Sequence, residues 1–166
     1  EGWSWWIGDG EQRGDSPSTL PSRELAESLE FSAVDHLAQE DARRIVWKGG
    51  ARGRVWLESS QPVDLSAFAE GRDTLVATLR LSGKPGSAVR LSVGGTALSL
   101  DALLSDLPEG EWVEVGFPLS CFVQAGAPIG AVRQLFGFDT EGPLDLAVSR
   151  VALGAAPDRK LDCASR

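Results

Sequence analysis

The sequence predicts an all-β fold, an antiparallel two-sheet β-sandwich of the jelly-roll type with one or two short helices. Apolar and polar residues alternate in short runs, as they do when only one face of each strand is buried. Glycine and proline interrupt these runs at short intervals, which is typical of tight connections between antiparallel strands. The predicted strands are 31–35, 44–48, 54–58, 74–81, 88–93, 112–117, 135–139 and 144–153.

A chain of 166 residues is long enough to bury the core of one domain. We expect the β-sandwich to span 31–156. A Trp-rich segment with a loop and a short helix precedes it at 1–30, and a polar tail follows at 157–166. Because the chain starts at Glu1 and contains no methionine, we expect it to be a processed protein or part of a longer one.

Two helical segments are expected. The first covers 21–30, because Ser22 is suited to the N-cap and Leu25 and Leu29 lie one helical turn apart. The second is a helical turn over 101–107 with Asp101 as its cap. The residues after Pro118 are expected to form a loop before the next strand.

Charge and hydropathy exclude two classes of partner. The formal net charge is −8, so the phosphate backbone of a nucleic acid would be repelled, and no basic stripe offsets this charge. No apolar run approaches the length of about 20 residues that crosses a bilayer. We therefore expect neither nucleic acid nor a membrane as a partner.

Cys121 and Cys163 are the only cysteines. In an oxidising compartment a disulfide between them would contribute about 4 kcal/mol in the chain-entropy model. In the cytosol they would remain thiols. The sequence leaves both alternatives open.

Strand alternation indicates which tryptophans face the core. Trp47 shares the phase of Ile45 and is expected in the core, whereas Trp56 and Trp112 fall on the polar phase of their strands. A large aromatic ring on an outward face is costly to leave in water. Three explanations are open: a loop or another domain covers the rings, a sugar stacks on them, or they are exposed.

Catalytic machinery is not recognisable in the sequence. The single histidine, His36, cannot form a zinc site with two distant cysteines, and no G-x-S-x-G motif accompanies it. No pair of carboxylates stands out as an acid and a nucleophile for glycoside hydrolysis. We expect no catalytic metal, although a structural calcium ion is conceivable, with Asp145 and Glu30 as ligands.

Several segments resemble a known accessory domain. They are Trp112-Val-Glu-Val115, Pro118-Leu-Ser-Cys-Phe122, Ala125-Gly-Ala127, Asp139-Thr-Glu-Gly142 and the strand that closes at Leu153, with 41–47 and 62–66 upstream. Together they resemble the galactose-binding-like domain at the C-terminus of bacterial family 3 β-glucosidases and exo-1,3/1,4-β-glucanases. The similarity covers about 31–153.

The resemblance implies a non-catalytic module of a β-glucan-degrading enzyme, located in the periplasm or outside the cell. Its partners would be the upstream catalytic domains of the same polypeptide and a β-glucan or a cello- or laminari-oligosaccharide. The candidate carbohydrate-binding residues are Trp56, Trp112, Trp3, Trp5 and Gln12. An alternative is a purely structural domain that packs on the catalytic body. For Gln12, the alternatives are contact with the parent's substrate and a place in an interdomain linker.

Overall fold

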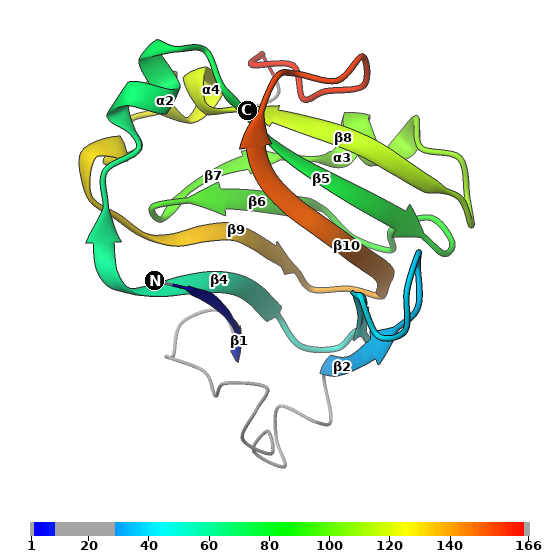
Figure 1. Cartoon of the computed structure of the whole chain (residues 1–166). Helices are drawn as coiled ribbons and strands as arrows, with labels where there is room; N and C mark the ends of the chain where they lie inside the picture. The colour runs from blue at the N-terminus through cyan, green and yellow to red at the C-terminus, as the bar shows by residue number, and fades with distance from the viewer. Residues whose placement is uncertain (1, 9–28, 165–166) are drawn as a thin grey trace.

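Two five-stranded antiparallel sheets pack face to face in the computed structural model, which describes residues 2–8 and 29–164 (Figure 1). The first sheet has the strand order β1-β4-β9-β6-β7, and the second has the order β2-β3-β10-β5-β8. The strands are β1 (Trp3–Gly8), β2 (Leu29–Val34), β3 (Ala42–Trp47), β4 (Gly53–Val63), β5 (Thr74–Leu81), β6 (Val89–Val93), β7 (Thr96–Ser99), β8 (Trp112–Pro118), β9 (Val132–Thr140) and β10 (Leu144–Gly154). The predicted β-sandwich is confirmed.

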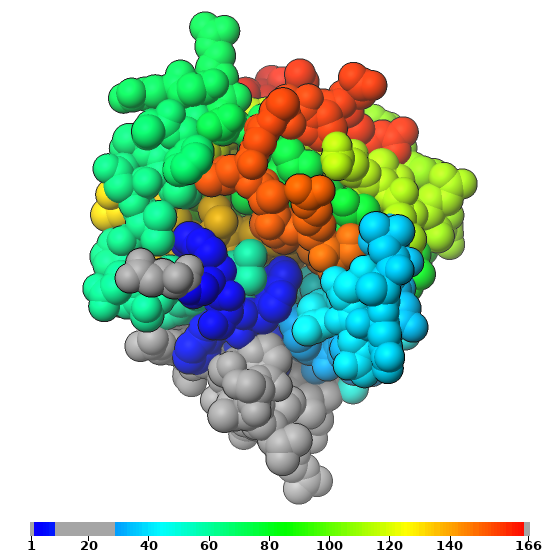
Figure 2. All heavy atoms as spheres, viewed as in Figure 1, coloured from blue at the N-terminus to red at the C-terminus, as the bar shows by residue number. Residues whose placement is uncertain are grey.

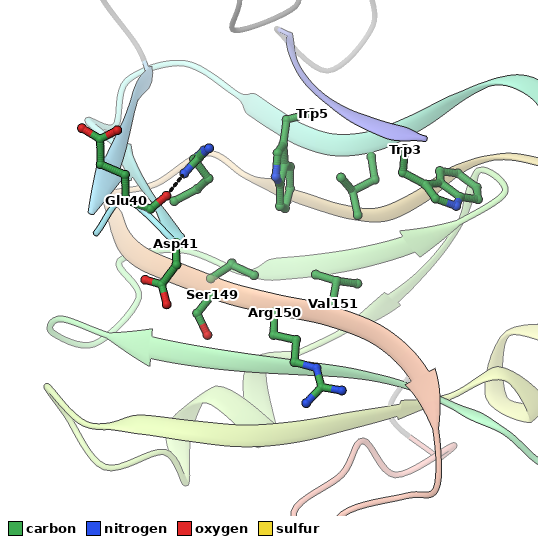
Figure 3. A pocket seen from close by; sticks show the side chains of 10 residues that line it. Trp3, Trp5, Glu40, Asp41, Ser149, Arg150 and Val151 are labelled. Atoms are coloured by element: carbon green, nitrogen blue, oxygen red, sulfur yellow. Dashed lines mark hydrogen bonds between the residues drawn. The ribbon is translucent and has the colours of Figure 1, made fainter. Parts of the chain in front are cut away.

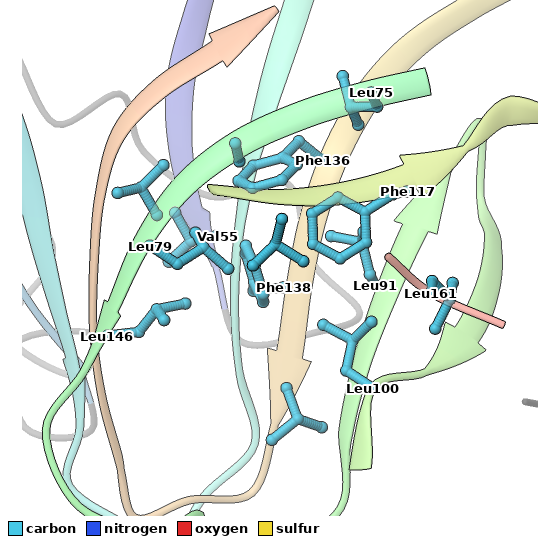
Figure 4. Packing of buried hydrophobic residues seen from close by; sticks show 14 of the residues in the cluster. Val55, Leu75, Leu79, Leu91, Leu100, Phe117, Phe136, Phe138, Leu146 and Leu161 are labelled. Atoms are coloured by element: carbon cyan, nitrogen blue, oxygen red, sulfur yellow. The ribbon is translucent and has the colours of Figure 1, made fainter. Parts of the chain in front are cut away.

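The core fills the space between the two sheets, because alternate residues of each strand point inward. Phe136 and Phe138 of the first sheet meet edge to face, with ring centroids 4.8 Å apart, and Phe117 of the second sheet packs on Phe136 at 5.7 Å (Figure 4). Trp47 is buried, as predicted, and its indole Nε1–H donates to the carbonyl of Gly53 at 2.8 Å.

The sheets include residues that the sequence analysis placed outside the sandwich. Trp3–Gly8 forms β1 and pairs with β4, and β2 begins at Leu29 rather than at residue 31. The expected helix over 21–30 lies mostly outside the described residues, but Leu29 and Glu30 belong to a strand and not to that helix. Leu29 is buried against the core, which explains why this end of the segment is extended.

Short helices close the ends of the sandwich. They are α2 (Ser66–Glu70), α3 (Asp101–Ser105), α4 (Leu119–Gln124) and the 3₁₀ turn η1 (Ile129–Ala131). The expected turn at 101–107 is confirmed as α3, but Asp101 does not cap it: the N-cap is Leu100, and the Asp101 carboxylate accepts the Val89 N–H at 2.9 Å. The loop expected after Pro118 is instead α4, because its turn buries Leu119 and Phe122.

Cys121 and Cys163 form a disulfide, with a Cα–Cα distance of 4.7 Å. The C-terminal tail also pairs with β8, since Gly116 N–H donates to the Arg159 carbonyl at 2.9 Å and Leu161 N–H donates to the Gly116 carbonyl at 2.8 Å. Leu161 is 3% exposed. Residues 157–164 are thus attached to the sandwich by backbone bonds, burial and a covalent cross-link.

Two strands contain a bulge that changes where their side chains point. In β9 the register against β4 shifts near Phe136, which has φ +53°, and in β10 the register against β5 shifts between Val148 and Arg150. Ser149 is the extra residue of the β10 bulge. Among the described helices, none is long and apolar enough to span a membrane.

Candidate functional site

An open groove with a volume of about 430 Å³ lies where β1 of the first sheet faces β10 of the second. At the surface, β1 lies beside the hairpin of β2 and β3 and below the residues of β10 in this view (Figure 2). The volume is in the range of small-ligand sites. The groove is lined by Trp3, Trp5, Glu40, Asp41, Arg43, Leu57, Val148, Ser149, Arg150 and Val151 (Figure 3).

The aromatic wall of the groove comes from β1. Trp3, Trp5 and Ile7 occupy the inward phase of this strand, and both tryptophans point from β1 toward β10 (Figure 3). The Trp5 ring packs on Phe31 with centroids 6.0 Å apart and on Phe136 at 6.4 Å. Trp5 thus closes the inner side of the groove, while Trp3 lies further along it. Both rings are partly exposed.

The opposite wall comes from the loop 35–41 between β2 and β3. The Asp41 carboxylate accepts three backbone N–H groups, from His36 at 2.7 Å and from Leu37 and Ala38 at 3.0 Å. Desolvation acts to raise the pKa of Asp41, but the hydrogen bonds from Leu37, His36 and Ala38 outweigh it, so the pKa lies below its ordinary value. These bonds hold the loop in one shape.

Glu40 is the residue of this loop that bends the chain back toward β3. Its φ is +55°, and its N–H donates to the Asp35 carboxylate at 2.7 Å. Glu40 is exposed at the edge of the groove, and its carboxylate points away from Trp5 (Figure 3). A left-handed conformation in a non-glycine residue is uncommon, and here the side-chain acceptor of Asp35 stabilises it.

Arg43 reaches the groove from the start of β3, on the inward phase shared with Ile45 and Trp47. Its Nη1 donates to the carbonyls of Glu40 at 2.8 Å and Ala42 at 2.9 Å. Within the described part of the chain it has no carboxylate partner. The guanidinium is therefore fixed in direction while Nε and Nη2 remain free to donate to a ligand.

The floor and the far rim of the groove come from β4 and β10. Leu57 and Val148 are buried and apolar. The bulge at Ser149 brings the hydroxyl of this residue and the Arg150 side chain to the rim. Bulges are frequent where a strand re-aims side chains at a binding site.

Trp56 is not available as a surface platform. It shares the outward face with Arg54 and Glu58, as the alternation predicted, but it is only 2% exposed. Its Nε1–H donates to Glu58 Oε2 at 2.8 Å, and the Arg54 guanidinium lies 4.9 Å from the ring centroid. The expectation of a sugar-stacking Trp56 is therefore corrected in favour of the alternative in which protein atoms cover the ring.

Arg54 links Trp56 to the rest of this face. It donates to Gln134 Oε1 at 2.8 Å and to Ser92 Oγ at 3.2 Å, and its burial lowers its pKa. Gly137 lies next to the Arg54 guanidinium. A Cβ atom at this position would be only 3.1 Å from Arg54 Nη2, so the absence of a side chain at Gly137 leaves room for the guanidinium. The Arg54 guanidinium and the Trp56 indole N–H thus already have hydrogen-bond partners within the protein.

Trp112 lies on the outward face of the second sheet, paired in register with Arg80. The His36 ring lies 4.3 Å from its ring centroid, and Arg80 Cζ lies 4.8 Å from it. Trp112 is half-buried. Its phase is as predicted, but two neighbouring side chains already contact the ring.

Gln12 and the two conceivable calcium ligands are the remaining candidates. Gln12 lies outside the described residues. Both oxygens of Asp145 accept from Arg44, at 2.9 and 2.6 Å, and a structural calcium ion with Asp145 and Glu30 as ligands stays a prediction. The residues that the structure describes contain no group of three His, Cys, Asp or Glu side chains that could hold a metal.

Sequence reasoning identified Trp3 and Trp5 but missed the other residues of the groove. Alternation at Trp3, Trp5 and Ile7 is a strand signal that indicates one shared face. The contribution of Glu40, Arg43 and Ser149 depends on which strands of the two sheets face each other, and no local pattern carries that information.

Known proteins share this fold. A family model described as galactose-binding domain-like matches residues 1–153. The chain therefore belongs to this family, and the resemblance to galactose-binding-like domains is confirmed. No curated protein matches the chain.

Three solved structures show how far the likeness extends. The exo-1,3/1,4-β-glucanase EXOP from a Pseudoalteromonas species has a TM-score of 0.74 and 19% identity over 96% of this chain, which spans 20% of that protein. The extra C-terminal domain (X) of ExoP has a TM-score of 0.73 and 20% identity, covering 97% of this chain and 91% of that domain. An agarase, AgWH50C, has a TM-score of 0.52 and 14% identity over 80% of this chain and 25% of its own. At these identities the likeness establishes the fold.

Proposed function

We propose that the chain is a non-catalytic accessory domain of a β-glucan-degrading glycoside hydrolase of the family 3 type, and that it binds or positions carbohydrate. The observation that carries this proposal is the groove that Trp3 and Trp5 line together with polar residues, among them Arg43 and Ser149. Aromatic walls with a few oriented polar groups are suited to sugars, because the C–H faces of a sugar ring stack on indole and its hydroxyls need donors and acceptors.

This chain is similar to an extra C-terminal domain of a glucanase, which supports the proposal that it is attached to catalytic domains. The Cys121–Cys163 disulfide supports a periplasmic or extracellular location, since disulfides persist in oxidising compartments. A chain that has one histidine and no evident pair of catalytic carboxylates supports a role in binding rather than in bond cleavage.

Affinity electrophoresis tests the proposal directly. The 166-residue chain is run in native gels with and without laminarin or a mixed-linkage β-glucan, next to a protein of similar charge that binds no glycan. We expect retardation in the glucan gel and no turnover of an aryl β-glucoside by the homogeneous chain. Unchanged migration in every glucan contradicts carbohydrate binding, and measurable turnover contradicts the non-catalytic assignment.

The second candidate function is structural packing on the catalytic body. Among the residues that the structure describes, three large apolar side chains are exposed: Leu37 at 87% in the loop 35–41, Phe68 at 42% in α2 and Val123 at 43% in α4. Helices α2 and α4 contact each other, so Phe68 and Val123 belong to one end of the sandwich (Figure 1). Exposed apolar side chains of this size favour a protein interface at that end.

A further inference from the structure

We propose that the groove prefers a glycan that carries a carboxylate, such as a chain with uronate residues, and that Arg43 recognises this group. The inference rests on the proposed carbohydrate-binding function, and it adds an acidic ligand class that a β-glucan does not supply. It starts from the edge of the Arg43 guanidinium formed by Nε and Nη2, which has no partner among the described residues.

The same edge of two other arginines already binds a carboxylate in this domain. Arg44 donates from Nε and Nη2 to the two oxygens of Asp145, at 2.9 and 2.6 Å. Arg52 uses the same two atoms on the carboxylate of Asp139. In Arg43 it is Nη1 that donates to backbone carbonyls, so the corresponding edge is left for a ligand. Two parallel N–H groups match a carboxylate better than a hydroxyl group, because both carboxylate oxygens can accept at once.

Arg43 is half-buried and forms no ion pair with a described residue. It lies on the inward phase of β3, opposite the buried Val148 of β10 in register. A guanidinium that is partly removed from water and lacks an anionic partner costs free energy, and a bound carboxylate offsets this cost. The two backbone carbonyls that accept from Nη1 hold the guanidinium in place before a ligand binds, so binding requires little further ordering of this side chain.

The carboxylates near the groove do not occupy the free edge of Arg43. Both oxygens of Asp41 accept backbone N–H groups, and the Glu40 carboxylate points away from Trp5 (Figure 3). Arg150 adds a second cation to the lining. The net charge of −8 opposes an anion at long range, but at physiological salt charges more than about 8 Å apart are largely screened. Direct hydrogen bonds in the groove therefore decide which ligand is preferred.

The aromatic wall of the groove indicates that the carboxylate belongs to a sugar. Trp3 and Trp5 point from β1 toward β10 in the groove that Arg43 also lines (Figure 3). The C–H face of a uronate ring can stack on indole while the carboxylate on its C5 atom binds the guanidinium. An acidic peptide offers the carboxylate without the ring, so it would use only part of the site.

Isothermal titration of the 166-residue chain at about 0.15 M salt tests this inference. The ligands are cellohexaose and β-1,4-hexaglucuronate, which differ only in the oxidation of C6, and hexaglutamate, which carries carboxylates without sugar rings. The variants are Arg43→Gln, Arg43→Lys and the matched control Arg90→Gln. Arg90 is an exposed arginine of β6 outside the groove, and its Nη2 also donates to a backbone carbonyl, that of Ala97 at 3.2 Å. Far-UV circular dichroism and the thermal midpoint verify the fold of each variant, and Arg43→Lys replaces Arg43→Gln if the latter does not fold.

We expect the wild type to bind hexaglucuronate about tenfold more tightly than cellohexaose, as expected for a charge-assisted bidentate contact, and not to bind hexaglutamate. In Arg43→Gln the ratio of the two glycan affinities should fall to about one. Arg43→Lys keeps the charge but not the paired donors, so its ratio should fall to about two or three. Arg90→Gln should keep the wild-type ratio.

Equal or tighter binding of cellohexaose by the wild type overturns the preference for a carboxylate, while carbohydrate binding stands. An unchanged ratio in either Arg43 variant, or loss of the preference in Arg90→Gln, shows that the Arg43 edge is not the recognition group. Hexaglutamate binding as tight as that of hexaglucuronate identifies a site for acidic peptides and overturns the sugar ligand. Absence of binding to both glycans overturns the inference together with the proposed function.

Discussion

The Trp5 ring lies against Phe31 with the two ring centroids 6.0 Å apart, and this contact joins β1 of one sheet to β2 of the other. Both strands are at the edges of their sheets, where the core would otherwise open to solvent. The groove begins where this contact ends. The same pair of strands therefore seals the core and shapes the candidate site.

Replacing Trp5 with alanine should destabilise the domain by about 2–3 kcal/mol, below the range for a fully buried tryptophan because the ring is partly exposed. The loss arises from the contacts with Phe31 and Phe136. Urea unfolding monitored by circular dichroism measures it, with Trp3→Ala as the control that should cost clearly less. Equal losses in the two variants would show that Trp5 has no special structural role.

Replacing Trp56 with alanine should lower stability by about 3–5 kcal/mol, because the side chain is 2% exposed and its indole N–H is bonded to Glu58. Trp112→Ala, at a half-buried position, should cost less. Denaturant unfolding of the two variants at one pH provides the comparison. A Trp56 variant with wild-type stability would contradict the burial of this ring.

Acid should weaken the loop 35–41 through Asp41. Its pKa in the folded state lies below the ordinary value of 3.8, so the ionised carboxylate contributes its full stabilisation above that value and loses it as the pH falls through the folded-state pKa. Asp41→Asn should therefore be less stable than the wild type at about pH 6, and the difference should shrink toward about pH 3.

The measurement is the free energy of unfolding of both proteins at the two pH values. Asp106→Asn, at an exposed position after α3, is the control and should leave the wild-type pH dependence intact. If the free energies of unfolding of the wild type and Asp41→Asn differ by the same amount at both pH values, ionisation of the Asp41 carboxylate is not the cause of the difference.

Removing the disulfide should destabilise the domain by about 4 kcal/mol, the chain-entropy value for a sequence separation of 42 residues. The double variant Cys121→Ser, Cys163→Ser should unfold at a lower urea concentration than the oxidised wild type. Added reductant should shift the wild type toward the variant and leave the variant unchanged. Identical midpoints of the oxidised wild type and the variant would contradict this cross-link.

Most strands could be predicted because their alternation is local. Thr74–Leu81 was predicted with its observed bounds, and the inward phase of Leu75, Ala77 and Leu79 is confirmed by their burial. The strand β7 was missed because Gly94-Gly95 was interpreted only as a break. Both glycines have positive φ, at +58° and +84°, as a two-residue hairpin turn requires, so this dipeptide was in fact a hairpin signal.

The parts of the candidate site that could not be predicted depend on contacts between distant segments. Alternation assigned Trp56 to the outward face, but it does not reveal what covers that face. Arg43 was an ordinary strand residue in the sequence, and its role follows from the approach of β1 to β10 and from the carbonyls that hold its guanidinium. The three hydrogen bonds to Asp41 likewise exist only once the loop has formed.

The indole N–H signals of the tryptophans provide the most direct test that the glycan binds in the groove. Two-dimensional ¹⁵N nuclear magnetic resonance of the 166-residue chain resolves them, and single Trp→Phe variants assign them. On titration with laminarihexaose or cellohexaose, we predict that the signals of Trp3 and Trp5 shift, while those of the buried Trp47 and Trp56 stay in place. A saturable shift confined to Trp112, with Trp3 and Trp5 unmoved, would contradict binding in the groove.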